Sequence, residues 1–121
     1  MNEKFIQNLD KLPADVRRQF VLLANQYGEK KKQKSIQDDF LTFVKHVWPD
    51  FIEGSHHKRI ADKFNKLASG EIKRLIINMP PRHTKSEFGS YLLPAWMVGR
   101  NPKLKIIQST NTTELSVRFG R

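Results

Sequence analysis

The chain has 121 residues, 38% of them hydrophobic, which is enough for one ordinary domain with a buried core. It has no apolar run near the roughly 20 residues of a membrane span, and its start, Met1-Asn2-Glu3-Lys4, lacks the apolar segment of a secretion signal. The absence of cysteine excludes disulfides and thiolate zinc sites. These features predict a cytosolic protein without a membrane partner.

The formal net charge is +10 and the isoelectric point is about 10.1. Residues 1–60 carry 11 basic and 8 acidic side chains, whereas residues 61–121 carry 11 and 4. Lysine and arginine displace counterions from nucleic acid, so this excess favours a polyanionic partner, DNA or a nucleotide, for the second half. Solubility together with nonspecific binding is the plainer interpretation of the same charge.

The N-terminal third predicts helices. Phe5, Ile6 and Leu9 favour a short helix, and a second helix follows from Pro13 to Gly28. Its apolar stripe is Val16, Phe20, Leu23 and Tyr27. Residues 29–34 are basic and have no apolar face, which is typical of a solvated helix end or linker. We therefore expect residues 1–34 to be a helical extension with a basic linker.

Two further helices are predicted before residue 70. Ser35, with Asp38 three residues on, resembles a capping box in front of an apolar stripe that ends at Trp48-Pro49. Ser55 can cap the next helix, which Ser69-Gly70 would end.

The remaining chain alternates between strand and helix patterns. Ile72–Ile77 predicts a buried strand, and Glu87–Gly99 a helix that Pro94 kinks. Lys105–Gln108 predicts a second strand, with a last helix from Thr110 or Asn111 towards Arg121. We therefore predict an α/β fold for residues 35–121, a partial domain with an incomplete parallel sheet.

The octapeptide Met79-Pro80-Pro81-Arg82-His83-Thr84-Lys85-Ser86 lies between the first predicted strand and the following helix. This layout is typical of a phosphate-binding loop. Backbone N–H groups face an anion, Lys85 reaches the terminal phosphates and Ser86 ligates Mg²⁺. The expected nucleotide-binding residues are Pro81, Arg82, His83, Thr84, Lys85 and Ser86. Arg82 is also a candidate for sensing the γ-phosphate.

The loop departs from the usual motif, which has glycine where Met79 and Thr84 stand. A β-branched side chain at Thr84 restricts the backbone and crowds a phosphate. Pro80 and Pro81 supply no N–H donors, so residues 82–86 must supply the cradle. The plainer interpretations are an exposed loop charge for Arg82, a solvated helix-start lysine for Lys85 and a capping serine for Ser86.

His56 and His57 begin the helix before the first predicted strand. Adjacent helical residues point about 100° apart, and no third ligand is evident, so a zinc site is disfavoured. A capping or packing histidine and a purine contact are the two interpretations that remain.

Four segments together resemble the N-terminal ATPase part of the large terminase subunit of tailed bacteriophages and prophages. They are Phe43–Pro49, His56–Asp62, Gly70–His83 and Leu93–Pro102. The resemblance covers about residues 36–121. It implies a RecA-like, additional-strand P-loop ATPase that drives viral DNA into a capsid, together with a metal-dependent nuclease resembling ribonuclease H in the C-terminal part of such proteins.

The resemblance implies ATP and Mg²⁺ as cofactors, with Lys85 and Ser86 in the phosphate and metal roles. It aligns Arg82 with an arginine of the family's loop, and His57 or His56 with its adenine-contacting region. The implied partners are double-stranded DNA, the small terminase subunit, the portal protein and further copies of the full-length protein. The implied location is the bacterial cytoplasm, transiently at the capsid portal.

The chain contains no apolar strand ending in acidic residues after the loop and no nuclease carboxylates. We therefore expect residues 1–121 alone to lack ATP turnover, since phosphoryl transfer needs a positioned metal and an oriented water. A basic DNA-binding packaging accessory, a helicase-like P-loop translocase and an inactive prophage remnant are the competing hypotheses.

Overall fold

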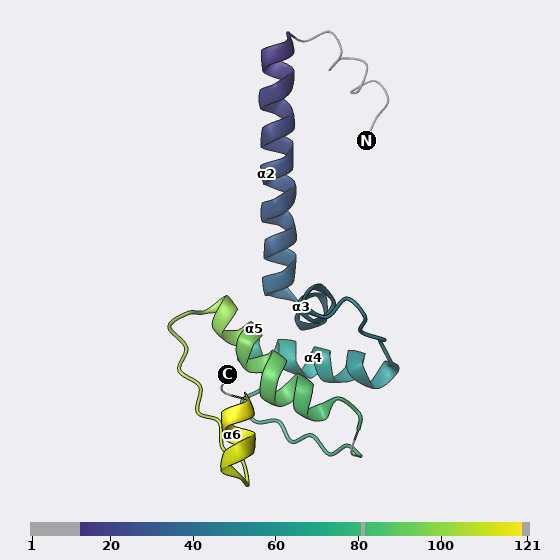
Figure 1. The fold of residues 1–121 in the computed structure, drawn as a ribbon, viewed down its shortest axis with the longest axis vertical. Helices are drawn as coiled ribbons and strands as arrows, with labels where there is room; N and C mark the ends of the chain where they lie inside the picture. Colours follow the sequence, from purple (N-terminus) through teal and green to yellow (C-terminus); the bar gives the residue numbers. More distant parts are fainter. Residues whose placement is uncertain (1–12, 81, 120–121) are drawn as a thin grey trace. The chain divides into compact units, whose positions relative to one another are not determined.

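The computed structural model describes residues 13–80 and 82–119, and these form helices joined by turns and extended segments (Figure 1). The helices are α2 (Ala14–Asp38), α3 (Phe40–Val47), α4 (Ser55–Ser69), the π-helical η1 (Glu87–Leu92), α5 (Leu93–Arg100) and α6 (Thr113–Phe119). The chain divides into two units, Met1–Lys34 and Ser35–Arg121. The helix expected around Phe5–Leu9 lies outside the described residues.

The predicted α/β fold with a parallel sheet is wrong for the part of the chain that the structure describes, which is helical and contains no strand. Both predicted strands, Ile72–Ile77 and Lys105–Gln108, are extended but unpaired. In the first, Leu75, Ile77 and Met79 pack against the helical core and alternate with exposed neighbours. Its period of two therefore reflects a half-buried extended segment and not a sheet.

The second predicted strand makes little contact with the core, since Ile107 is 97% exposed. Parallel sheets occur almost only where both faces are covered, and small sheets without such cover are marginal in water. Two apolar extended segments do not meet these conditions by themselves.

The helix α2 also runs further than its sequence pattern predicts. Gly28 does not end it, and it continues through the basic run to Asp38 with no residue buried. Lysine, glutamine and glutamate are good helix formers, so their propensity offsets the cost of one interior glycine, about 1 kcal/mol. No helix in the described residues combines the length and the apolar character that crossing a membrane requires.

The core of the second unit is an aromatic cluster centred on Phe40. This ring is fully buried and makes edge-to-face contacts with Phe64, Phe88 and Trp96 at centroid distances of 5.0, 5.4 and 5.4 Å. These contacts join α3 to α4, η1 and α5. Val44, Ile60, Ala61 and Leu92 complete the buried set.

Asp39, not Ser35, caps the start of α3. Its carboxylate accepts from the backbone N–H of Thr42 at 2.7 Å and from the Asn65 side chain of α4 at 2.8 Å. Asn65 in turn accepts the N–H of Phe40 at 2.9 Å. Burial raises the pKa of Asp39, but these hydrogen bonds outweigh it, so the pKa is lower than the ordinary value.

Pro94 lies inside a continuous helical stretch and does not end it. The turn before it is the π-helix η1, and Pro94 occupies the first turn of α5. Proline lacks the N–H that would bond the carbonyl of Ser90. The side-chain amide of Gln108 donates to that carbonyl at 2.9 Å, so the freed acceptor is satisfied by the extended segment 103–110.

We expect Phe40→Ala to lower the free energy of unfolding by about 3–5 kcal/mol, because it removes the ring that four helical segments share. Urea denaturation followed by far-ultraviolet circular dichroism would measure this. Ile76→Ala, at a side chain 86% exposed, is the matched control and should change the value by less than about 0.5 kcal/mol. Equal effects of the two substitutions would contradict the central position of Phe40.

Candidate phosphate-binding site

The loop that precedes η1 places Lys85 and Ser86 in the first helical turn. Both residues are helical and exposed, and the N–H of Phe88 donates to the carbonyl of Thr84 at 2.9 Å. This bond closes the first turn, so the N–H groups of residues 85–87 have no partner within the helix. They carry the positive end of the helix dipole, which favours an anion.

The backbone ahead of this turn has an unusual conformation. Arg82 and Thr84 have φ values of +66° and +56°, while His83 between them is not in the left-handed region. Left-handed residues near a helix start are a feature of anion-binding nests, in which successive N–H groups face one concave side. Thr84 thus adopts the conformation for which the phosphate-loop motif uses glycine, at a cost in strain.

A pocket of about 300 Å³ opens beside the loop. It is lined by Pro80, Arg82, Thr84, Lys85, Ser86 and Glu87. Lys85 and Ser86 also border a second pocket of about 350 Å³, which lies against apolar side chains of the extended segment and α4, among them Leu75 and Phe64. Only the first pocket brings the cationic groups Arg82 and Lys85 together, so it is the candidate for a phosphate.

His57, in the first turn of α4, anchors the loop through a hydrogen bond to Thr84. Its Nδ1 accepts the N–H of Gly54 at 2.9 Å, which leaves the proton on Nε2. Nε2 lies 2.7 Å from Oγ1 of Thr84 and therefore donates to it, and Thr84 Oγ1 donates onward to the carbonyl of His83 at 2.7 Å. This chain of hydrogen bonds holds Thr84 in its strained conformation.

Gly54 lies close to the His56 side chain at this helix start. A Cβ at this position would lie 2.9 Å from Cε1 of His56. A larger residue here would push against the His56 ring, which is tilted by 45° to the His57 ring with centroids 3.8 Å apart.

The surroundings of His57 favour its neutral form. The ring is 6% exposed and packs against Phe51 and Phe88, with centroids 4.8 and 5.1 Å away. Burial lowers the pKa of His57, and the nearby His56 and His83 lower it further, whereas Glu53 raises it. Burial and the two histidines outweigh Glu53, so the ring is neutral and can keep the tautomer that the loop needs.

The structure brings together most of the residues that the sequence singled out. Arg82, Thr84, Lys85 and Ser86 line one pocket, His83 is exposed at its edge and approaches His56 with ring centroids 5.9 Å apart, and Pro81 lies outside the described residues. An adenine contact by His57 stays a prediction. Both of its ring nitrogens are bonded within the chain, which gives it a positioning role.

Sequence reasoning missed Glu87. Its carboxylate lines the phosphate pocket and lies 3.9 Å from Nη2 of Arg118 on α6. The only sequence signal was its position directly after Ser86, which is common for an acidic residue in a first helical turn.

The pocket offers Mg²⁺ two oxygen-bearing side chains, the Ser86 hydroxyl and the Glu87 carboxylate. Mg²⁺ usually keeps several waters and binds one or two carboxylates together with phosphates, so these residues would hold it only with a nucleotide present. Within residues 13–80 and 82–119, no group of three or more histidine, aspartate or glutamate side chains is placed to hold a metal ion.

In comparisons with known proteins, no family model, no curated protein and no solved structure matches the chain.

We expect Thr84→Val to lower the free energy of unfolding by about 1–3 kcal/mol. Valine keeps the β-branched shape but leaves the buried Nε2–H of His57 without its acceptor. Thr84→Ser, which retains the hydroxyl, is the matched control. Urea denaturation of the three proteins checks this, and equal stability of the valine and serine variants would show that the His57 bond is dispensable.

Stability should fall as the pH drops below the ordinary histidine pKa of 6.5. Because the pKa of His57 is lower in the folded protein, the unfolded chain takes up its proton first. The stabilisation is complete above pH 6.5 and is lost as the pH falls towards the folded pKa. Thermal unfolding between pH 5 and 8 should show a shallower decline for His57→Gln, and parallel profiles would contradict the assignment.

Proposed function

We propose that residues 80–87 bind the phosphates of a nucleoside triphosphate together with Mg²⁺. The observation that carries this proposal is the pair of left-handed residues, Arg82 and Thr84, directly ahead of Lys85 and Ser86. Left-handed backbone ahead of a helix start is found in anion-binding nests, and here it occurs although no glycine is present, which supports phosphate binding by the loop.

Each side chain of the pocket has a distinct part in this proposal. The Lys85 side chain is long and flexible, so its Nζ can reach and neutralise the terminal phosphates. The guanidinium of Arg82 can pair with phosphate oxygens through two parallel hydrogen bonds. The Ser86 hydroxyl is the protein ligand for Mg²⁺, which supplies charge neutralisation at the phosphates when bound. His57 contributes indirectly, because it fixes the loop through Thr84.

The wider role that we propose is that of the nucleotide-binding segment of a phage DNA-packaging terminase. This rests on the sequence resemblance and not on a shared sheet. It carries with it double-stranded DNA, the small subunit, the portal and further copies as partners, in the cytoplasm of a bacterial host. The net charge of +10 supports a polyanionic partner.

A DNA-binding packaging accessory is the second candidate, and α2 favours it. Lys30, Lys31, Lys32 and Lys34 are all exposed on a helix with no buried residue. Such a helix offers phosphate contacts that need neither the loop nor a nucleotide.

We expect Lys85→Ala to weaken the binding of Mg·ATP at least tenfold, because a charge-assisted contact to phosphate contributes about 1.5–3 kcal/mol. Isothermal titration calorimetry on the full chain measures this. Lys103→Ala removes the same charge from an exposed position away from the pocket and should leave the affinity unchanged.

Binding of duplex DNA, followed by fluorescence anisotropy at several salt concentrations, separates the two candidates. If the wild-type chain does not bind Mg·ATP, but binds DNA with an affinity that Lys85→Ala does not alter, the accessory function replaces the nucleotide-binding one.

A further inference from the structure

A groove of about 540 Å³ adjoins the phosphate pocket. It is lined by Val47, Trp48, Glu87, Tyr91 and Leu92. Glu87 lines both this groove and the phosphate pocket, so the two are contiguous. We refer to the space between Val47, Trp48, Tyr91 and Leu92 as the aromatic groove.

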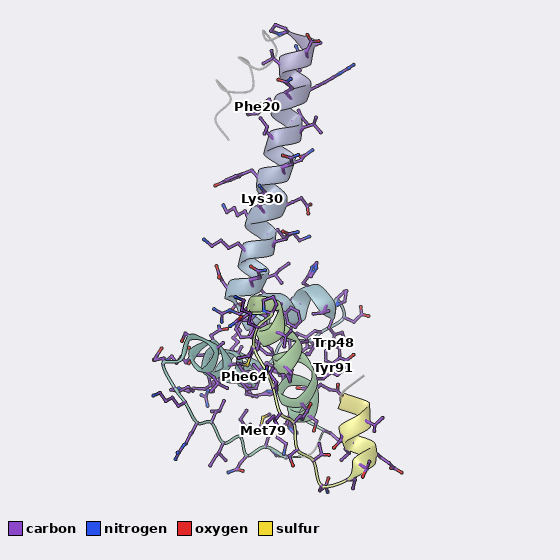
Figure 2. All side chains as sticks on the ribbon, turned by 90° about the vertical axis from the view of Figure 1, so that its left-hand side faces the viewer. Phe20, Lys30, Trp48, Phe64, Met79 and Tyr91 are labelled. Carbon is purple, nitrogen blue, oxygen red and sulfur yellow. The ribbon has the colours of Figure 1, made fainter. Side chains whose placement is uncertain are left out.

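The aromatic groove exposes large rings that the core does not use. Trp48 is 37% exposed and Tyr91 is 49% exposed. Figure 2 labels both side chains, which lie close together beside the green helical stretch. Aromatic rings contribute most to stability when they are buried. Exposed rings that gather in one concave place are therefore typical of binding sites.

The Trp48 ring is packed before any ligand arrives. The backbone N–H of Trp48 donates to the carbonyl of Val44 at 2.8 Å, and its ring rests against Phe51 with centroids 5.6 Å apart. Tyr91 follows Glu87 by four residues in η1, a spacing that keeps both near one face of the helical stretch. A ligand therefore meets one ring, that of Trp48, already packed against the protein, which lowers the entropy cost of binding.

We propose that the aromatic groove binds the base of the nucleotide whose phosphates occupy the adjoining pocket, and that Glu87 accepts hydrogen bonds from its ribose. This inference rests on the proposed function. Trp48 and Tyr91 offer ring faces for stacking, and Val47 and Leu92 offer apolar contacts. The carboxylate lies where the two spaces meet, and carboxylates bind ribose hydroxyls in other nucleotide sites.

The charge of Glu87 does not oppose this arrangement. Arg118 lies 3.9 Å from the carboxylate and offsets part of its repulsion for phosphate. The proximity of the phosphate pocket, which shares Glu87 with the groove, also favours a nucleobase over an apolar protein segment as the occupant, because a base is tethered to the group that the neighbouring pocket holds. The location differs from that of His57, whose ring is buried behind the loop.

The test compares Mg·ATP with Mg·tripolyphosphate, which has the phosphates but no base or ribose. Calorimetry on the full chain should show that ATP binds more tightly than tripolyphosphate. Tyr91→Ala should weaken ATP binding about tenfold, the magnitude expected for one stacking ring, and leave tripolyphosphate binding unchanged. Tyr91→Phe, which keeps the ring, is the matched control and should bind ATP like the wild-type chain.

Tryptophan fluorescence gives a second readout. Trp96 is 1% exposed and does not line the aromatic groove, so the loss of an ATP-induced emission change in a Trp48 variant assigns that change to Trp48. The change should disappear in Trp48→Phe and should not occur with tripolyphosphate.

The outcomes separate the two proposals. If tripolyphosphate and ATP bind equally well, and Tyr91→Ala affects neither, the aromatic groove does not bind the base while the phosphate site stands. If neither ligand binds, the proposed function fails and the groove assignment fails with it.

Discussion

Burial of the Phe40 ring is the interaction on which the rest of the second unit depends. The ring touches Phe64 of α4, Phe88 of η1 and Trp96 of α5, so one side chain sets the mutual placement of three helical segments. Phe88 stands two residues after Ser86, and its burial orients the first helical turn. The exposed position of Ser86 follows from this, because a residue two positions away lies on the opposite side of the same turn and faces solvent.

The loop depends on a second constraint, the neutral His57 ring. It is clamped between Phe51 and Phe88 and joins the start of α4 to Thr84 through two hydrogen bonds. A threonine in the left-handed region is unfavourable in isolation and persists because its surroundings hold it there. The core therefore stabilises the strained backbone at the candidate site. Because His57 is hydrogen-bonded to Thr84, a change in the protonation of His57 acts directly on the loop.

The extended segments show how the same sequence pattern supports different structures. Leu75, Ile77 and Met79 cover one side of the helical core without pairing to a strand, and Gln108 satisfies the carbonyl that Pro94 leaves free. One extended segment therefore stabilises the helices by packing against them, and the other by a hydrogen bond. In the described residues, helix packing and not a sheet supports the start of η1 and the candidate site beside it.

The sequence by itself determined the helices α4 and α5, the glycine that ends α4, and the gathering of Arg82, Lys85 and Ser86 at a helix start. Apolar spacing and the glycine at a helix end act over a few residues, so they can be read locally. The predicted N-caps Ser35 and Ser55 were wrong, since Asp39 caps α3 and Gly54 is the N-cap of α4, which begins at Ser55. The tertiary structure alone decided whether the apolar extended segments pair, which conformation Thr84 adopts, and that Trp48 and Tyr91 share a groove. Pairing, strain and pocket walls depend on groups distant in sequence, such as His57 and Thr84, whose proximity no local pattern encodes.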